Sequence, residues 1–142
     1  MPTTSDRLIA EVLRSVNSIA LLGASQRPER PSYEVMQFLL SRGYDVIPVN
    51  PAIGDTEILG QKVYSSLEEI PRHIDMVDVF RNSSHLSSIV RDIVKQSIGI
   101  IWTQLDVIDT EAAQYAESHG IRVIMNRCPA IEWPRLEHIG LL

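Results

Sequence analysis

The sequence lacks the features that mark several large classes of protein. It has a single cysteine, Cys128, so no intrachain disulfide can form and a reducing compartment is expected. No apolar run approaches the roughly 18 residues that cross a bilayer, and the first residues lack the apolar core of a signal peptide. The 13 basic residues are outnumbered by 18 acidic ones, and the net charge of −5 argues against a nucleic-acid partner. We therefore expect one globular domain over residues 1–142, in the cytoplasm, with no membrane or nucleic-acid partner.

Glycine is also scarce, and this matters in the first loop, LLGASQRPERPS (21–32). An apolar run ends at Gly23 and a helix can begin at Ser32, which is the arrangement that binds phosphate at a helix N-terminus. A dinucleotide site would need G-x-G-x-x-G here, but Gly23 is the only glycine of the loop. Asn50 stands where an acidic residue would bind the ribose, so an NAD(P)-dependent oxidoreductase is the weaker alternative.

Short apolar runs rich in valine and isoleucine recur along the chain. Such runs are typical of strands buried on both faces of a parallel sheet. Between them apolar residues recur with helical spacing, as at Leu86, Val90 and Ile93. This alternation predicts an α/β fold, a single Rossmann-like domain with a five-stranded parallel sheet and helices on both faces. The expected strand order is 3-2-1-4-5, with 2-1-3-4-5 as the alternative. The five runs are SIALLG (18–23), DVIPVN (45–50), DMVDVF (75–80), GIIWTQ (99–104) and IRVIMN (121–126).

The first loop is the expected ligand site, because such sheets bind ligands beyond the carboxyl ends of their strands, beside strand 1. Gly23 lets the backbone come close to a ligand, and the hydroxyl of Ser25 can donate to it. Arg27 and Arg30 can form charge-assisted hydrogen bonds with phosphate oxygens. Arg81, after the third run, either contacts a phosphate or carboxylate or ties neighbouring loops together.

Five motifs at the carboxyl ends of the strands carry a resemblance to a known family. In order, and over nearly the whole chain, the sequence resembles the small bacterial and archaeal coenzyme A-binding proteins. These are similar to the N-terminal CoA-binding domain of the succinyl-CoA synthetase alpha subunit. The motifs are G-A-S-x-x-P-x-R-P-S (23–32), P-V-N-P (48–51), V-D-V-F-R (77–81), W-x-Q (102–104) and R-C-P-A-I-E-x-P-R-L (127–136).

The resemblance implies a domain that binds coenzyme A or an acyl-CoA across the strand ends, as a carrier, sensor or regulatory module. The first loop would contact the diphosphate through backbone and hydroxyl donors, and the end of the second strand would border the adenosine. The end of the third strand would flank the nucleotide and the start of the pantetheine arm. The expected ligand contacts are Gly23, Ala24, Ser25, Arg27, Arg30, Ser32, Asn50, Pro51, Val79, Phe80, Arg81 and Gln104.

Two departures from the family pattern change these expectations. Ala52 and Ile53 follow Asn50 and Pro51, where the synthetase has a lysine, so Arg27 or Arg30 would have to bind the 3′-phosphate. Asp106 stands where the family is expected to have glycine. Aspartate tolerates a left-handed backbone better than most residues, but its carboxylate disfavours an anionic group beside it.

No group of residues predicts catalysis or a metal site. The synthetase depends on a second domain with a phosphorylated histidine, and this chain ends soon after the fifth run. Cys128 precedes a helix start and follows Arg127, but no histidine is placed to activate it, so we expect it to be unreactive. Glu132 and Arg135 are expected in a structural ion-pair network, with each other or with Arg81. The four histidines lack metal-ligand spacing and are expected at the surface: His73, His85, His119 and His138.

Overall fold

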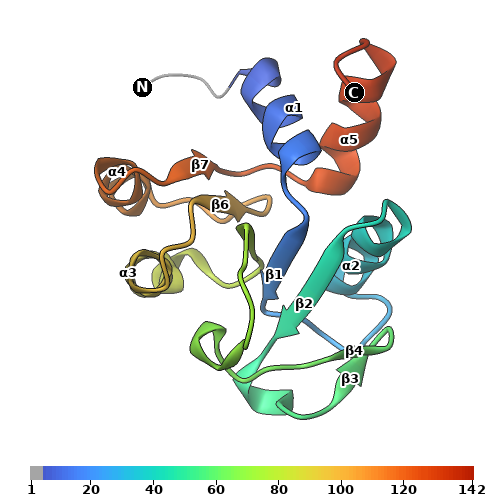
Figure 1. Cartoon of the computed structure of the whole chain (residues 1–142), viewed down its shortest axis with the longest axis vertical. Coiled ribbons are helices and arrows are strands. Elements are labelled where there is room, and N and C mark those ends of the chain that lie inside the picture. Colours follow the sequence, from blue (N-terminus) through green and yellow to red (C-terminus); the bar gives the residue numbers. More distant parts are fainter. Residues whose placement is uncertain (1–4) are drawn as a thin grey trace.

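Strands and helices alternate along the chain as the sequence predicts. The computed structural model describes residues 5–142, and Figure 1 shows a central sheet with helices packed around it. No helix within this range is both long enough and apolar enough to span a membrane. The elements, with η for a 3-10 helix, are α1 (Asp6–Ser15), β1 (Ser18–Leu22), α2 (Pro31–Ser41), β2 (Asp45–Val49), η1 (Pro51–Ile53), β3 (Glu57–Ile58), β4 (Gln61–Lys62), η2 (Leu67–Glu69), β5 (Met76–Val79), η3 (Ser83–His85), α3 (Leu86–Lys95), β6 (Ile100–Thr103), α4 (Thr110–Ser118), β7 (Arg122–Ile124) and α5 (Pro129–His138).

The sheet contains five parallel strands in the order β2-β1-β5-β6-β7. This confirms the predicted Rossmann-like α/β class and the five-stranded parallel sheet. Numbered by the five strands alone, however, the order is 2-1-3-4-5. The preferred prediction, 3-2-1-4-5, is therefore wrong, and the alternative is correct. The third strand, β5, pairs with β1 on the side away from β2, so that Val77 lies opposite Ala20.

Pro48 gives a physical reason for this order. The observed order leaves β2 at an edge of the sheet, whereas 3-2-1-4-5 would place it between two strands. Proline has no N–H to donate and is confined to edge strands or bulges. On the outer side of β2 the Pro48 carbonyl accepts a hydrogen bond from the Tyr64 N–H at 3.0 Å. The strand β5, by contrast, is fully buried, as expected for a strand inside the sheet.

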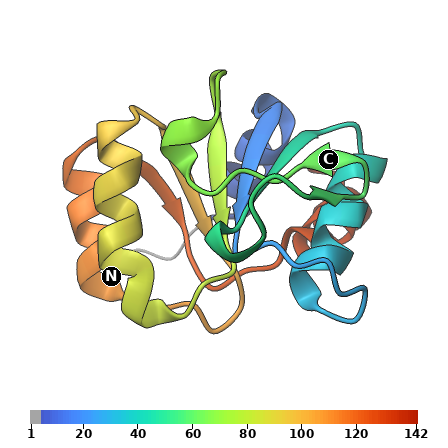
Figure 2. The ribbon, with the colours of Figure 1, turned by 90° about the horizontal axis from the view of Figure 1, so that it is seen from below.

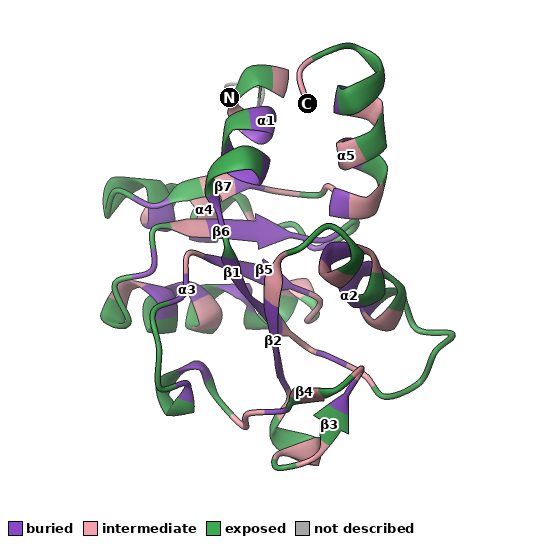
Figure 3. Ribbon diagram, turned by 45° about the vertical axis from the view of Figure 1, so that its right-hand side comes forward, coloured by how far each residue is buried: buried purple, intermediate pink, exposed green. Residues whose placement is uncertain are grey.

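The sheet separates two apolar clusters, and each cluster is covered by its own helices. Figure 2 shows α3 and α4 on one side of the sheet and α2 and α5 on the other, and Figure 3 shows the strands buried between them. The helical spacing of apolar residues explains how α3 packs on its side of the sheet, because Leu86, Val90 and Ile93 are all buried. On the other side Trp102 is fully buried, and its indole N–H donates to the Arg127 carbonyl at 2.8 Å.

An ion-pair network ties α5 to α1. The carboxylate of Glu132 is 5% exposed and accepts hydrogen bonds from Arg135 at 2.8 Å and Arg127 at 3.3 Å. Arg135 also contacts Asp6 at 2.7 Å, and this hydrogen bond lowers the pKa of the Asp6 carboxyl. The predicted structural role of Glu132 and Arg135 is confirmed, and Arg81 takes no part in the network.

Substitution of Glu132 tests this network. Glu132→Gln keeps the size of the side chain but removes the charge between two arginines. We expect the free energy of unfolding to fall by about 1.5–3 kcal/mol in urea denaturation, the range for hydrogen bonds to charged groups. The control is Glu11→Gln, since Glu11 forms an exposed pair with Arg122 at 3.2 Å that contributes about 1 kcal/mol or less. Equal losses in the two variants would contradict the structural importance of the network.

Candidate ligand-binding site

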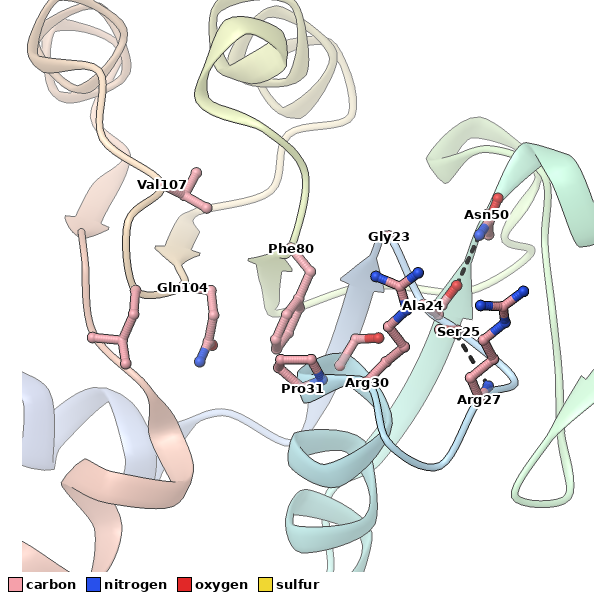
Figure 4. Close-up of a pocket in the computed structure, with 12 residues that line it drawn as sticks. Gly23, Ala24, Ser25, Arg27, Arg30, Pro31, Asn50, Phe80, Gln104 and Val107 are labelled. Carbon is pink, nitrogen blue, oxygen red and sulfur yellow. Dashed lines mark hydrogen bonds between the residues drawn. The ribbon is translucent and has the colours of Figure 1, made fainter.

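A cleft of about 380 Å³ opens at the carboxyl ends of the strands, between the first loop, the N-terminus of α2 and the ends of β5 and β6 (Figure 4). We call it the first cleft. Most of the predicted ligand contacts line it, although they come from four separate parts of the sequence. These contacts are Gly23, Ala24, Ser25, Arg27, Arg30, Ser32, Asn50, Phe80 and Gln104.

A second cleft, of about 210 Å³, lies on the other side of Gly23. Of the predicted contacts, Pro51 and Arg81 line this cleft instead of the first. His85 lines it as well, together with residues of the segment between β4 and η2. Val79 lines neither cleft, because it is fully buried in the apolar cluster that α3 and α4 cover.

Several residues of the clefts escaped the sequence analysis. Pro31 and Leu105 directly follow predicted contacts, and Val107 lies three residues after Gln104, so the rule that ligands bind at carboxyl strand ends could have found them. Ser66 and Leu67 belong to the Ser-Leu-Glu-Glu pattern of a helix cap, which predicts structure and not a ligand contact, and Ser65 carries no signal. The missed residues are Pro31, Leu105 and Val107 in the first cleft and Leu22, Val49, Ser65, Ser66, Leu67, His85, Ser88, Ile89 and Asp92 in the second.

The backbone donors of the first loop differ from the expectation. The N–H groups of Gly23 and Ala24 both donate to the Val49 carbonyl, at 3.0 and 3.3 Å, so they are not free to bind a phosphate. Within residues 5–142, the N–H groups of Ser25 and Ser32 form no hydrogen bond, and both residues line the first cleft. The free backbone donors therefore lie one step further along the loop and at the start of α2.

The start of α2 also differs by two residues from the predicted cap. Pro31 occupies the first helical position and Arg30 precedes it as the N-cap residue, so Ser32 is not the cap. Proline suits the first position because its fixed φ is helical and its missing N–H would be unpaired there. Ser32 is 5% exposed at the second position, and its unpaired N–H is one of those that give a helix N-terminus its partial positive charge.

Asn50 holds the first loop in place. Its side-chain nitrogen donates to the Ala24 carbonyl at 2.8 Å (Figure 4). Its side-chain oxygen accepts from the Ala52 N–H at 2.9 Å. Ser25 Oγ accepts from the Arg27 N–H at 3.1 Å, so its own O–H remains available as a donor. The loop conformation is thus fixed by hydrogen bonds within the protein, and the side chain of Asn50 provides two of them.

The first cleft has a cationic end and an apolar end. Within the described chain Arg27 and Arg30 form no ion pair, and Figure 4 shows their guanidinium groups at the same end as Asn50. Phe80 and Val107 lie toward the other end, on the side of Gln104 (Figure 4), and Leu105, which directly follows Gln104, also lines the cleft. The arrangement suits an elongated ligand with phosphates at one end and a less polar arm at the other.

The β6–α4 loop beyond the apolar end contains Asp106, which has a φ of +70°. This is the left-handed backbone expected where the family has glycine. The Asp106 N–H donates to the side-chain oxygen of Asn126 at 2.7 Å, and its carbonyl accepts from Ser83 Oγ at 3.2 Å. The side chain of Asp106 is exposed and does not line the first cleft.

The cysteine and the histidines lie apart from the first cleft. Cys128 is 7% exposed, packs in the cluster beneath α1, α2 and α5, and makes no side-chain cap for α5. His73 pairs with Asp75 at 3.0 Å near the start of β5. Among residues 5–142, no three His, Cys, Asp or Glu side chains are grouped in a way that could hold a metal ion.

Gly23 separates the two clefts and cannot carry a side chain without strain. Its φ is +87°, and a Cβ at this position would lie 3.1 Å from the backbone carbon and oxygen of Phe80. Real Cβ atoms are rarely this close to other atoms, and neither backbone can move without disturbing the sheet. Gly23 therefore sets how closely the end of β1 approaches the end of β5, besides opening the loop to a ligand.

The variants Gly23→Ala and Gly43→Ala test this constraint. Gly43 has a similar φ of +89° but nothing within 4 Å of a Cβ, so its variant measures the cost of the backbone conformation alone. We expect about 1–2 kcal/mol loss of unfolding free energy for Gly43→Ala. Gly23→Ala should lose at least about 1 kcal/mol more, the lower end of the cost of overpacking. Equal losses in thermal or urea denaturation would show that the Phe80 backbone does not restrict this position.

Sequence and structure comparisons show which known proteins this chain is similar to. The uncharacterized protein YneT of Bacillus subtilis is 38% identical over 128 residues, which covers 90% of this chain and 93% of that protein. A hypothetical protein from Pyrococcus horikoshii has a solved structure that matches with a TM-score of 0.88 and 37% identity, covering 96% of this chain and 99% of that one.

A larger enzyme subunit contains a similar region. Subunit alpha of acetate–CoA ligase [ADP-forming] I from Pyrococcus furiosus is 27% identical over 128 residues, which is 80% of this chain but 28% of that subunit. The chain therefore spans less than a third of the ligase subunit. The family described as CoA binding domain matches residues 17–134, a range that contains all five strands of the parallel sheet and both clefts. The chain belongs to the CoA binding domain family.

Proposed function

We propose that this chain binds coenzyme A or an acyl-CoA at the first cleft and performs no chemistry of its own. The observation that carries the proposal is the set of unpaired donors at one end of the cleft. Ser25 and Ser32, whose N–H groups are free within residues 5–142, line the same cleft as Arg27 and Arg30, whose guanidinium groups form no ion pair there. A diphosphate needs this combination of a helix N-terminus and cations. Membership of the CoA binding domain family and the likeness to an acetate–CoA ligase subunit support the same ligand.

The different chemistry of the two ends of the first cleft favours one orientation of bound CoA. With the diphosphate between Ser25 and Ser32, the adenosine would extend past Asn50 and Pro51 toward the second cleft. The pantetheine arm would extend the other way, along Phe80 toward Gln104. This direction places the charged part of the ligand against the cationic end and the arm against the apolar end.

The 3′-phosphate needs its own cation, because Ala52 and Ile53 replace the lysine of the synthetase. Arg27 and Arg30 are the exposed candidates in the first cleft. Arg81 is a third candidate, since it is half-buried in the second cleft and, within the described residues, forms no ion pair. We assign the contact to Arg27 or Arg30, which lie at the same end of the cleft as Asn50.

A non-catalytic role fits the side chains around the clefts. Cys128 is buried in the core, and the first cleft contains no histidine, aspartate or glutamate among its lining residues. A domain of this kind would act as a carrier, a sensor or a module controlled by a protein partner. An NAD(P)-dependent oxidoreductase remains the alternative from the sequence, and no residue of the first cleft favours it, since Asn50 is already paired within the loop.

Thermal denaturation with different ligands tests the proposed ligand class. A ligand present at one hundred times its dissociation constant adds about 2.7 kcal/mol of stability. For a chain of this size CoA should therefore raise the melting temperature by several degrees, whereas NAD should leave it unchanged. The variant Ser25→Ala should weaken CoA binding by about 1 kcal/mol, the loss of one hydrogen bond. Equal shifts with NAD and CoA, or no shift with CoA, would overturn the proposal.

A comparison of CoA with 3′-dephospho-CoA tests the assignment of the 3′-phosphate. Arg27→Gln, Arg30→Gln and Arg81→Gln each keep a long polar side chain but remove the charge. If the substituted arginine binds the 3′-phosphate, the variant protein should bind CoA more weakly than the wild type by about 1.5–3 kcal/mol. Its affinity for dephospho-CoA should be unchanged. We expect this result for Arg27 or Arg30 in calorimetric titrations at one fixed salt concentration. The same result for Arg81 alone would move the 3′-phosphate to the second cleft.

A further inference from the structure

Asp78 is a buried carboxyl group without a partner. It lies in β5, opposite Leu21 of β1 and Trp102 of β6, and is 0% exposed. Within residues 5–142 neither of its carboxyl oxygens has a hydrogen-bond partner. Phe80 follows two residues later on the same strand, so both side chains point to the same face of the sheet. Asp78 therefore lies on the same face as Phe80, which lines the first cleft, and two residues further from the carboxyl end of the strand.

Gln104 is the second buried polar group on this face. It follows Trp102 by two residues, and its N–H donates to the Val79 carbonyl at 3.0 Å, which continues the pairing of β6 with β5. Figure 4 shows its side chain pointing to the same side as Phe80. Its Oε1 is buried and has no partner among the described residues. Its amide nitrogen forms no hydrogen bond either but is not buried, and Gln104 lines the first cleft.

The two groups are diagonal neighbours on adjacent strands. With strands about 4.8 Å apart and a rise of about 3.3 Å per residue, the Cα atoms of residues so placed are about 8 Å apart. The side chains of an aspartate and a glutamine on the same face can together span this distance. An ionised Asp78 and the Gln104 oxygen would both be acceptors, and each would lose its hydrogen bonds to water on burial. A protonated carboxyl group, by contrast, has an O–H that can donate to the amide oxygen.

We propose that Asp78 is protonated in the folded protein and donates its O–H to Oε1 of Gln104, so that the Gln104 amide group donates into the cleft to a carbonyl oxygen of the pantetheine arm. Burial supports the protonated state, because it raises the pKa of the Asp78 carboxyl well above its usual range. Asp78 then acts as a positioning residue that fixes which end of the amide faces the ligand. Gln104 contacts the ligand itself.

Infrared spectroscopy tests the pair without any ligand. At neutral pH the wild-type protein should show the carbonyl band of an un-ionised carboxyl group. Asp78→Asn should abolish this band, and Gln104→Leu should shift it by removing the hydrogen-bond acceptor. A spectrum without the band, or a band that Gln104→Leu leaves unmoved, would overturn the Asp78–Gln104 hydrogen bond.

The contact with pantetheine rests on the proposed function and has a separate test. CoA and adenosine 3′,5′-bisphosphate, which lacks the pantetheine arm, are titrated against the same variants. Gln104→Leu should weaken CoA binding roughly three- to tenfold, as for one hydrogen bond, and leave the bisphosphate affinity unchanged. Asp78→Leu should have the same effect, whereas Asp78→Asn should bind CoA like the wild type, because its amide can still donate to Gln104.

The controls separate the possible failures. Ser25→Ala should weaken both ligands, since it lies in the diphosphate region. A wild-type protein that binds neither ligand would refute the proposed function. The hydrogen bond between Asp78 and Gln104 would then be judged from the infrared spectra alone. If the variants at Gln104 bind CoA like the wild type, or lose affinity for both ligands equally, Gln104 is not the pantetheine contact. Should Asp78→Leu fail to fold, Gln104→Leu and Asp78→Asn still decide the question.

Discussion

The close approach of two backbones at Gly23 determines where a ligand can lie on this protein. The end of β1 passes so near to Phe80 that a Cβ at Gly23 would lie 3.1 Å from the Phe80 backbone. Gly23 lines both clefts, so this contact lies between them. The first loop begins at the same glycine, so its direction, and with it the position of Ser25 and the start of α2, follows from this one contact.

The first loop is held in its conformation before any ligand arrives. Asn50 ties it to the end of β2, and the Val49 carbonyl accepts from both Gly23 and Ala24. The donors that remain free are those of Ser25 and Ser32. Binding to a loop of this kind costs little conformational entropy, because few groups have to be ordered. The residues that resemble family ligand contacts therefore divide into two groups, some that shape the loop and some that remain available to bind.

The strands could be predicted from the sequence because each is a short apolar run, and the observed bounds differ from the runs by no more than a few residues. The strand order could not, since it depends on which edge of β1 the third strand joins, a choice between distant parts of the chain. Pro48 indicates the correct order, because a proline is poorly tolerated in a strand that lies between two others, and so favours an edge position for β2. In the site, most of the predicted contacts line the first cleft. The motifs could not reveal that the N–H groups of Gly23 and Ala24 are paired or that Val79 points into the core, because both depend on the register of the sheet.

The edges of the sheet limit how this protein can associate. An exposed strand offers a row of free N–H and C=O groups, and another chain can pair with it to extend the sheet. On one edge, Pro48 interrupts that row and Tyr64 occupies part of it. On the other edge, β7 contains three residues, Arg122–Ile124, which is short for a template. Neither edge favours the addition of a strand, so contacts between copies of this chain, or with a partner protein, are expected through helices and loops.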